Sequence, residues 1–224
     1  PPRNLAPLSY RIRRTIDSMP VRRLSSVAQL AFCYHIYPGA SHNRKEHVIG
    51  VYQTVSRLLR YLLLDFKNPI CALLLSERHQ RIALLASLFH DIAHVPLMHE
   101  FEDSIPELKQ ELYLAEIFER KWGSDNFQKE IDDILSLWDL NRIDMLLVLS
   151  NKKYCTKPEN ISPDEWDILW LRPDYELLRS LFDGAIDADK IDYLQRDALH
   201  AGVQFGHAVD WERLTRKLTA ALFL

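Results

Sequence analysis

The chain has 224 residues, of which 47% are hydrophobic and 26% charged, and its formal net charge is −3. This composition is that of a globular protein with enough chain for one large core, and it excludes a low-complexity or strongly basic protein. The slightly acidic balance does not indicate a nucleic-acid partner, although a local basic patch stays open.

Three cysteines, Cys33, Cys71 and Cys155, lie far apart in the sequence and indicate a reducing compartment, not a disulfide framework. No apolar run is long enough to span a bilayer, and there is no signal peptide. We therefore expect a cytoplasmic protein without a membrane partner, or a nuclear one in a eukaryote. The chain begins without Met and stops inside an apolar stretch, 218–224, so we also expect it to be a fragment of a longer protein.

Leucine and alanine recur at helical spacing and no alternating strand pattern persists, which predicts an all-α fold. The first helix is expected from about Pro20 to His35. A second, capped by Ser41 or Asn43, should run to about Asp65. Further helices are predicted from Ser76, with His79 at the position of a capping box, and over 107–122, 127–138, 141–152, 173–182 and 187–200, with a last one near Asp210.

Residues 152–163 are expected to form a surface loop, and Gly202 is expected to end the helix over 187–200. No internal repeat or interdomain linker is found. We therefore predict an N-terminal extension over 1–20 and one domain over 21–224 that is truncated at its C-terminal end.

The most unusual stretch is the decapeptide 90–99, which follows a strongly apolar run and contains His90, Asp91, His94 and His99. Neutral imidazole and carboxylate are ligands for Zn, Fe, Mn, Ni and Mg. A helix end near Pro96 would let an adjacent His-Asp pair reach one ion. For any single histidine, a satisfied core residue is the simpler interpretation; several titratable groups together favour a site.

Two other polar clusters occur over 37–47 and 186–197, in or beside the regions 39–50 and 184–206 that hold five of the six glycines. In the second cluster, Asp189, Asp192, Tyr193 and Arg196 recur at helical spacing and form one polar stripe. A solvated helix face is the usual explanation of such a stripe. Tyr193 and the apolar surroundings instead favour a face that looks partly into a cleft.

An isolated histidine, a His-Asp doublet some forty residues later and an aspartate about a hundred residues further resemble the metal pattern of HD domains. Here the pattern falls on His47, His90, Asp91 and Asp189. The decapeptide resembles the HD-x-G-H-x-P-x-S-H form. With the stretches 38–44 and 187–193, the resemblance narrows to the HD-domain deoxynucleoside triphosphate triphosphohydrolases, the branch of the SAM-and-HD-domain enzymes and bacterial dGTPase-like proteins.

This resemblance covers about 21–214 and rests on four separated motifs in the right order. It implies an HD-domain helical bundle with a mononuclear site between helices, where one divalent ion (Mn, Fe, Mg, Ni or Zn) is bound by the four residues just named. It also implies a nucleotide substrate, dNTP above others, and a homo-oligomer. By position, the catalytic groups would be His94 and His99 beside Asp91, and the substrate-binding groups would be Arg44, Lys190, Tyr193 and Asp197, the last reading the sugar 3′-hydroxyl.

The chain departs from the family pattern at three places. Ala93, Val95 and Met98 replace the usual Gly, Gly and Ser, and an alanine at 93 would disfavour a left-handed helix end. A further family histidine falls near Gln110-Glu111 in a loose part of the alignment, and glutamine cannot act as an acid or base. The C-terminal portion that often builds the regulatory or oligomeric surface is largely absent.

Three functions follow in order of preference. The first is a metal-dependent hydrolase that converts dNTP to deoxynucleoside and triphosphate through attack by metal-activated water. The second is another HD phosphohydrolase, acting on a nucleotide monophosphate, a cyclic nucleotide or a nucleic-acid end. The third is a metal-bound but catalytically weak module for nucleotide sensing, which Gln110 favours. Arg44 and Lys190 could also merely neutralise nearby acidic side chains.

Overall fold

The computed structural model describes residues 8–98, 101, 105, 108–207 and 209–219. Within these residues the fold is all-α, as predicted, and the strand-like pairing is limited to an isolated bridge between Ala28 and Asn43. The α-helices in chain order are α1 (Tyr10–Ile16), α2 (Met19–Arg22), α3 (Arg44–Leu63), α4 (Ile70–Leu74), α5 (Glu77–Phe89), α7 (Gln110–Phe118), α8 (Asp125–Trp138), α9 (Arg142–Leu149), α10 (Pro163–Leu171), α11 (Pro173–Ser180), α12 (Ala188–Ala201) and α13 (Trp211–Thr215). Short 3-10 helices are η1 (Arg23–Ser26), η2 (Cys33–His35), η3 (Lys152–Tyr154) and η4 (Phe205–His207).

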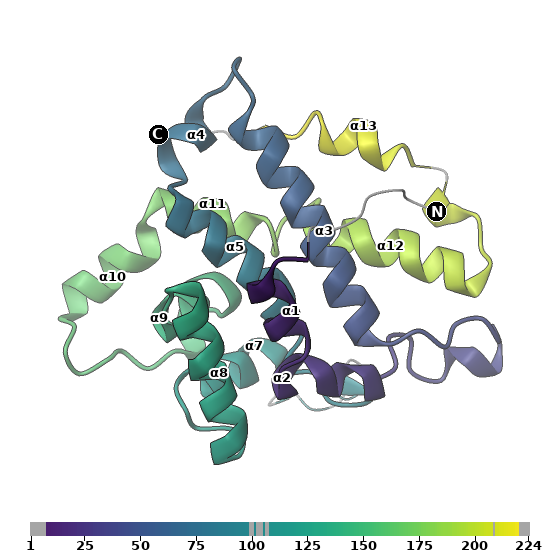
Figure 1. The fold of residues 1–224 in the computed structure, drawn as a ribbon, viewed down its shortest axis with the longest axis horizontal. Coiled ribbons are helices and arrows are strands. Elements are labelled where there is room, and N and C mark those ends of the chain that lie inside the picture. The colour runs from purple at the N-terminus through teal and green to yellow at the C-terminus, as the bar shows by residue number, and fades with distance from the viewer. Residues whose placement is uncertain (1–7, 99–100, 102–104, 106–107, 208, 220–224) are drawn as a thin grey trace.

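Helices α3 and α5 form the centre of the molecule and pack against each other (Figure 1). Each begins where the sequence predicts. The Asn43 side chain accepts a hydrogen bond from the N–H of Glu46, and Ser76 forms a capping box with His79. The second half of α5 is almost wholly buried, so this helix delivers its C-terminal end into the interior.

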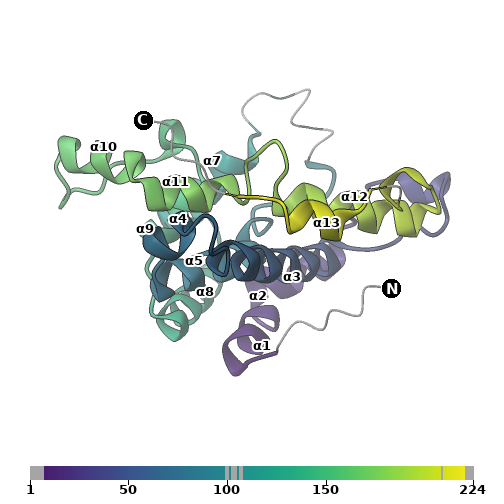
Figure 2. The ribbon, with the colours of Figure 1, turned by 90° about the horizontal axis from the view of Figure 1, so that it is seen from above.

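Helix α12 packs along α3, and α11 and α13 lie on the same side of the central pair (Figure 2). Asp187 caps α12 through the N–H of Lys190 at 2.7 Å, and Gly202 ends it in the left-handed region at φ 70°, as predicted. The packing is close at Gly50 of α3. A Cβ there would lie 1.9 Å from Asp192 Oδ1 and 2.1 Å from Arg196 Nη2, so this position requires the absence of a side chain.

The predicted helix over Pro20–His35 is wrong. Helix α2 and η1 end by Ser26, and Val27 is extended because its carbonyl accepts a hydrogen bond from the N–H of Arg44 at 2.9 Å. The N–H of Gln29 donates to the His42 carbonyl at 3.1 Å. This pairing takes residues 27–29 out of the helix and anchors the segment that leads into α3.

Other elements differ in extent. The helix predicted over 107–122 is described only as α7, and three helices, α1, α4 and α10, were not predicted. For α10 the start signal was present, because Ser162 forms a capping box with Glu165 and Pro163 occupies the first turn. Helix α1 packs on α8, and its Ile12 belongs to the core, although the sequence placed this segment in an extension.

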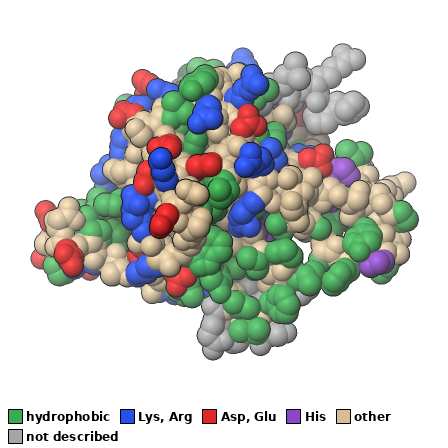
Figure 3. All heavy atoms as spheres, turned by 60° about the horizontal axis from the view of Figure 1, so that its bottom comes forward, with side chains coloured by type: hydrophobic (Ala, Val, Ile, Leu, Met, Phe, Trp, Pro, Cys, Tyr) green, Lys and Arg blue, Asp and Glu red, His purple; other side chains and the backbone are tan. Residues whose placement is uncertain are grey.

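The surface mixes both charge signs. Figure 3 shows a face on which Lys and Arg side chains are interspersed with Asp and Glu, while apolar side chains gather in its lower part. The loop around η2 exposes several large apolar residues: Phe32, Tyr34, Ile36 and Tyr37. Among the described helices, none has the length and apolarity needed to cross a bilayer.

The attachment of α1 predicts a measurable effect of Thr15. Its hydroxyl accepts a hydrogen bond from Trp138 Nε1 at 2.9 Å, and both side chains are buried. Thr15→Val should leave that indole N–H without an acceptor and lower the free energy of unfolding by about 1–3 kcal/mol. Urea denaturation measures this difference. Thr15→Ser retains the hydroxyl and is the matched control; equal stability of the valine and serine variants would contradict the contact.

Candidate metal centre

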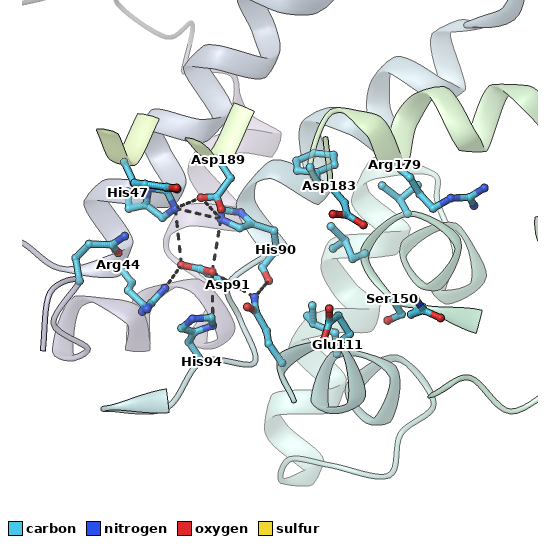
Figure 4. Close-up of a pocket in the computed structure, with 18 of the residues that line it drawn as sticks. Arg44, His47, His90, Asp91, His94, Glu111, Ser150, Arg179, Asp183 and Asp189 are labelled. Atoms are coloured by element: carbon cyan, nitrogen blue, oxygen red, sulfur yellow. Dashed lines mark hydrogen bonds and ion pairs between the residues drawn. The ribbon is translucent and has the colours of Figure 1, made fainter. Parts of the chain in front are cut away.

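Three helices bring the predicted ligands to one place. His47 lies in the first turns of α3, His90 is the C-cap of α5, Asp91 follows in the turn after it, and Asp189 lies in the first turn of α12. Figure 4 shows these four side chains turned toward a common point. Helix α5 ends at Phe89, directly before the doublet, which is earlier than the helix end near Pro96 that the sequence predicted.

The spacing of the donor atoms fits one shared ion. His47 Nε2 lies 3.3 Å from His90 Nε2, and the ligand atoms of His47, His90 and Asp91 all lie within 4.8 Å of one another. Two nitrogens bound to one zinc ion with tetrahedral angles lie about 3.3 Å apart. These three residues could therefore hold a divalent metal. Asp189 Oδ1 lies 2.7 Å from His47 Nε2 and 3.8 Å from His90 Nε2, and its role as the fourth ligand stays a prediction.

The other ring nitrogen of each histidine is engaged. His47 donates from Nδ1 to Asp192 Oδ2 at 2.9 Å, and His90 donates from Nδ1 to the Ser87 carbonyl at 2.9 Å. Both Nε2 atoms therefore present a lone pair to the same point. These lone pairs repel each other unless a proton or a metal cation lies between them.

The electrostatics agree with a cation site. Burial lowers the pKa of His47, but hydrogen bonds to Asp189 and Asp192 and the charge of Asp91 outweigh it and raise that pKa to about 10. Burial would raise the pKa of Asp91, yet the charges of His94, His90, Arg44 and His47 hold it well below its usual range. The negative potential that keeps a proton on His47 would equally attract a divalent ion in its place.

Asp192 is a site residue whose role the sequence did not predict. It lies on the polar stripe with Asp189, but its carboxylate turns to His47 Nδ1 and is held by Arg196 Nε at 2.8 Å and Nη2 at 2.9 Å. The space it occupies lies against Gly50. This carboxylate–histidine pair orients the ring and increases its basicity as a ligand.

Asp91 is also contacted by three groups outside the metal set. Arg44 Nη1 donates to Asp91 Oδ2 at 2.8 Å, and His94 Nδ1 lies 3.6 Å from Asp91 Oδ1 (Figure 4). The Gln110 side-chain amide donates to the His90 carbonyl at 2.8 Å and to Asp91 Oδ1 at 3.4 Å. Arg23 donates to the Ile92 and His94 carbonyls and thereby fixes the turn.

Position 93, where the family usually has glycine, does not adopt the left-handed backbone conformation. Ala93 is buried and has no positive φ, whereas Leu97 adopts the left-handed region at φ 63°. The expected cost at 93 therefore does not arise. Val95 is partly exposed, and Met98 is buried. His99, the other predicted catalytic histidine, lies outside the described residues.

A cavity of about 700 Å³ contains the candidate centre. Eight of the predicted site residues line this cavity: Arg44, His47, His90, Asp91, His94, Asp189, Tyr193 and Asp197. Lys190 is not among the lining residues, because its ammonium contacts Asp187 Oδ2 at 2.5 Å and the Gly184 carbonyl at 2.9 Å. Its predicted phosphate contact stays a prediction that requires the side chain to turn.

Other lining residues were not predicted, among them Gln29, Glu111, Arg179 and Asp183. Figure 4 shows Glu111 and Asp183 across the cavity from Arg44 and His94. Of these, only Glu111 lies in a stretch that the sequence compared with a family motif, the loosely aligned Gln110-Glu111 pair; the other three positions are revealed by the folded chain.

A model of the HD domain matches residues 44–197, which is more than half of the chain. This chain belongs to the HD-domain family. The chain is 33% identical over 220 residues to the deoxynucleoside triphosphate triphosphohydrolase SAMHD1 of Bos taurus, and the match covers 92% of this chain and 35% of that protein. The Homo sapiens protein of the same name is 34% identical over 218 residues, and that match covers 89% of this chain and 32% of that protein.

Among solved structures, a phosphohydrolase from Bacteroides thetaiotaomicron matches with a TM-score of 0.62 at 24% identity, over 94% of this chain and 43% of that one. At this identity the likeness shows the fold alone. The chain spans about a third of the length of the SAMHD1 proteins it matches.

The pairing of Asp192 with His47 leads to a prediction about metal affinity. Asp192→Asn keeps the shape but removes the charge, so metal affinity should fall about 10–100-fold while the fold is retained. Isothermal titration with Mn²⁺ or Zn²⁺ measures the change. Asp133→Asn, on an exposed position of α8, is the control. Unchanged affinity in a folded Asp192→Asn domain would show that the pair is not part of the metal site.

Proposed function

We propose that this HD domain is a metal-dependent phosphohydrolase that converts dNTP to deoxynucleoside and triphosphate. The observation that carries the proposal is the environment of Asp91. One buried carboxylate lies beside two histidines with converging Nε2 atoms, a guanidinium and a further buried histidine, at the wall of a cavity that Tyr193 and Asp197 also line. The printed names of the SAMHD1 relatives add support for this substrate.

The residues can divide the chemistry among themselves. A metal ion held by His47, His90, Asp91 and Asp189 would supply a Lewis acid and an activated water; which of Mn, Fe, Mg, Ni or Zn serves is open. Arg44 can exchange its contact with Asp91 for a phosphate oxygen, because a guanidinium offers several donors in one plane.

His94 is buried next to Asp91. Of the two predicted catalytic histidines, it is the one that lies within the described residues, and it could protonate the leaving 5′-oxygen. Tyr193 can donate its hydroxyl to a phosphate oxygen, and Lys190 can do so after leaving Asp187. Asp197 can accept a hydrogen bond from a sugar hydroxyl. These roles follow the family resemblance and the placement of each side chain around the cavity.

A catalytically weak nucleotide-binding module is the second candidate, and Gln110 favours it. Its amide donates to the His90 carbonyl and to Asp91 near where the family pattern places a histidine. An amide holds these groups in place but exchanges no proton under ordinary conditions. In this case metal and nucleotide would bind and turnover would be absent.

A product assay on each of the four dNTPs tests the proposal. With metal present, the domain should release triphosphate and deoxynucleoside, because the proposed reaction transfers the triphosphate to water and breaks the bond between the α-phosphorus and the 5′-oxygen of the sugar. Chromatographic separation of triphosphate, pyrophosphate and orthophosphate identifies the bond that is cleaved. Release of pyrophosphate or orthophosphate would instead indicate another HD phosphohydrolase, and binding without product would indicate the second candidate.

Variants in the same assay separate binding from chemistry. His94→Ala should lower turnover about 10²-fold or more with metal content unchanged. Arg44→Ala should weaken nucleotide binding and leave the metal bound, because removing a cation beside Asp91 makes the site more negative. Near-normal turnover in His94→Ala would assign that histidine to support of Asp91 and leave the proton donor elsewhere.

A further inference from the structure

His42 lies directly before the capping residue of α3 and is buried next to the candidate site without lining the cavity. Its ring stacks on His200 with centroids 4.1 Å apart and planes inclined by 16°. His42 is absent from the sequence-predicted site residues, and no role in metal or phosphate binding accounts for a wholly buried imidazole here.

One ring nitrogen of His42 has a clear partner. Nε2 lies 2.7 Å from Asp197 Oδ1, and the His42 side chain is 0% exposed. Nδ1 is buried and has no hydrogen-bond partner among the described residues. An ionised carboxylate only accepts hydrogen bonds, so the ring proton belongs on Nε2, where His42 donates it to Asp197.

The backbone around His42 holds the ring in this place. The His42 carbonyl accepts from the N–H of Gln29 at 3.1 Å. The Gly39 carbonyl lies 3.3 Å from His200 Nδ1, and a Cβ on Gly39 would lie 2.3 Å from the His200 carbonyl oxygen. The loop is therefore pressed against the C-terminal part of α12, and the donor is presented to Asp197 from a rigid support.

Asp197 connects His42 to the cavity, because its side chain is 15% exposed and belongs to the cavity wall. His42 occupies Oδ1, which leaves Oδ2 as the oxygen that can accept a hydrogen bond from a ligand. A carboxylate with one oxygen fixed cannot rotate freely, so the remaining acceptor keeps a defined direction. This is the requirement for reading a hydroxyl at a fixed distance from the metal.

We propose that His42 is a positioning residue that orients Asp197 and thereby sets the preference of the site for a nucleotide with a sugar 3′-hydroxyl. This inference rests on the proposed function. It assigns the recognition of the hydroxyl to a His–Asp pair, whereas the family resemblance alone assigns it to a single aspartate.

The experiment compares two ligands on matched variants. Affinities are measured by titration calorimetry for the dNTP that the domain binds most tightly and for the corresponding 2′,3′-dideoxynucleoside triphosphate, which lacks the hydroxyl. Mn²⁺ is present, and all proteins carry His94→Ala to prevent consumption of the ligand. In the reference protein, which carries His94→Ala and retains the native His42, the dNTP should bind about tenfold or more tightly than its dideoxy counterpart.

His42→Phe keeps a ring that can stack on His200 but has no donor, and His42→Asn is a second variant whose side chain ends short of Asp197. In both, the tenfold ratio should fall toward one through weaker dNTP binding, with metal content unchanged. His42→Gln restores a donor near the position of Nε2 and should recover the ratio. His35→Ala, an exposed histidine of η2, is the control that keeps it.

A folded His42→Phe or His42→Asn domain with the unaltered ratio would overturn the inference and leave the proposed function standing. Equal affinity of the reference protein, with His94→Ala and native His42, for the dNTP and the dideoxy ligand would also overturn the inference and leave the proposed function standing. If that reference protein binds neither nucleotide, the proposed function fails, and the inference fails with it.

Discussion

The interaction on which the rest of the structure depends is the approach of His47 and His90, whose Nε2 atoms lie 3.3 Å apart at the junction of α3, α5 and α12. Both rings are fixed from behind by acceptors for their Nδ1 protons. Three carboxylates, Asp91, Asp189 and Asp192, surround this junction. Such a concentration of acid in the interior is costly unless cations compensate it.

Two guanidinium groups provide part of that compensation, Arg44 on Asp91 and Arg196 on Asp192. Neither contacts Asp189, which relies on His47. A divalent ion between the histidines would complete the balance. The same requirement explains the close contact of α12 with α3 at Gly50, because Asp192 has to reach under His47.

The elements that carry the site were predictable because their signals are local. Asn43, Ser76 and Asp187 each cap the helix that follows them, and the apolar run before residue 90 leads α5 into the core. The break in the predicted first helix was not visible in the periodicity, since the backbone of residues 27–29 pairs with residues 42–44, which are too far along the chain for a local pattern to record.

The distinction between Asp189 and Asp192 was likewise beyond the sequence. Both lie on one stripe of α12, and only packing against α3 decides which carboxylate faces the cavity and which supports a ring. Lys190 shows the opposite case: its place in the chain beside Asp189 predicts a phosphate contact, yet its side chain turns back to the cap of its own helix. Sequence position fixes where a Cα lies better than where a flexible side chain ends.

The shared use of Asp91 links binding to chemistry. Arg44, His94 and Gln110 all lie within reach of this carboxylate, so a phosphate that draws Arg44 away changes the environment of a predicted metal ligand. Nucleotide and metal should therefore affect each other's affinity. This coupling needs no large movement, because the groups involved are side chains on three packed helices.

The most direct test of the account is the position of the metal in crystals of the domain soaked with Mn²⁺, located by anomalous scattering. The account predicts one strong peak bounded by His47 Nε2, His90 Nε2, an Asp91 oxygen and an Asp189 oxygen, and its loss in a folded Asp91→Ala domain. A peak elsewhere, or an unchanged peak in that variant, would contradict the assignment of the metal centre.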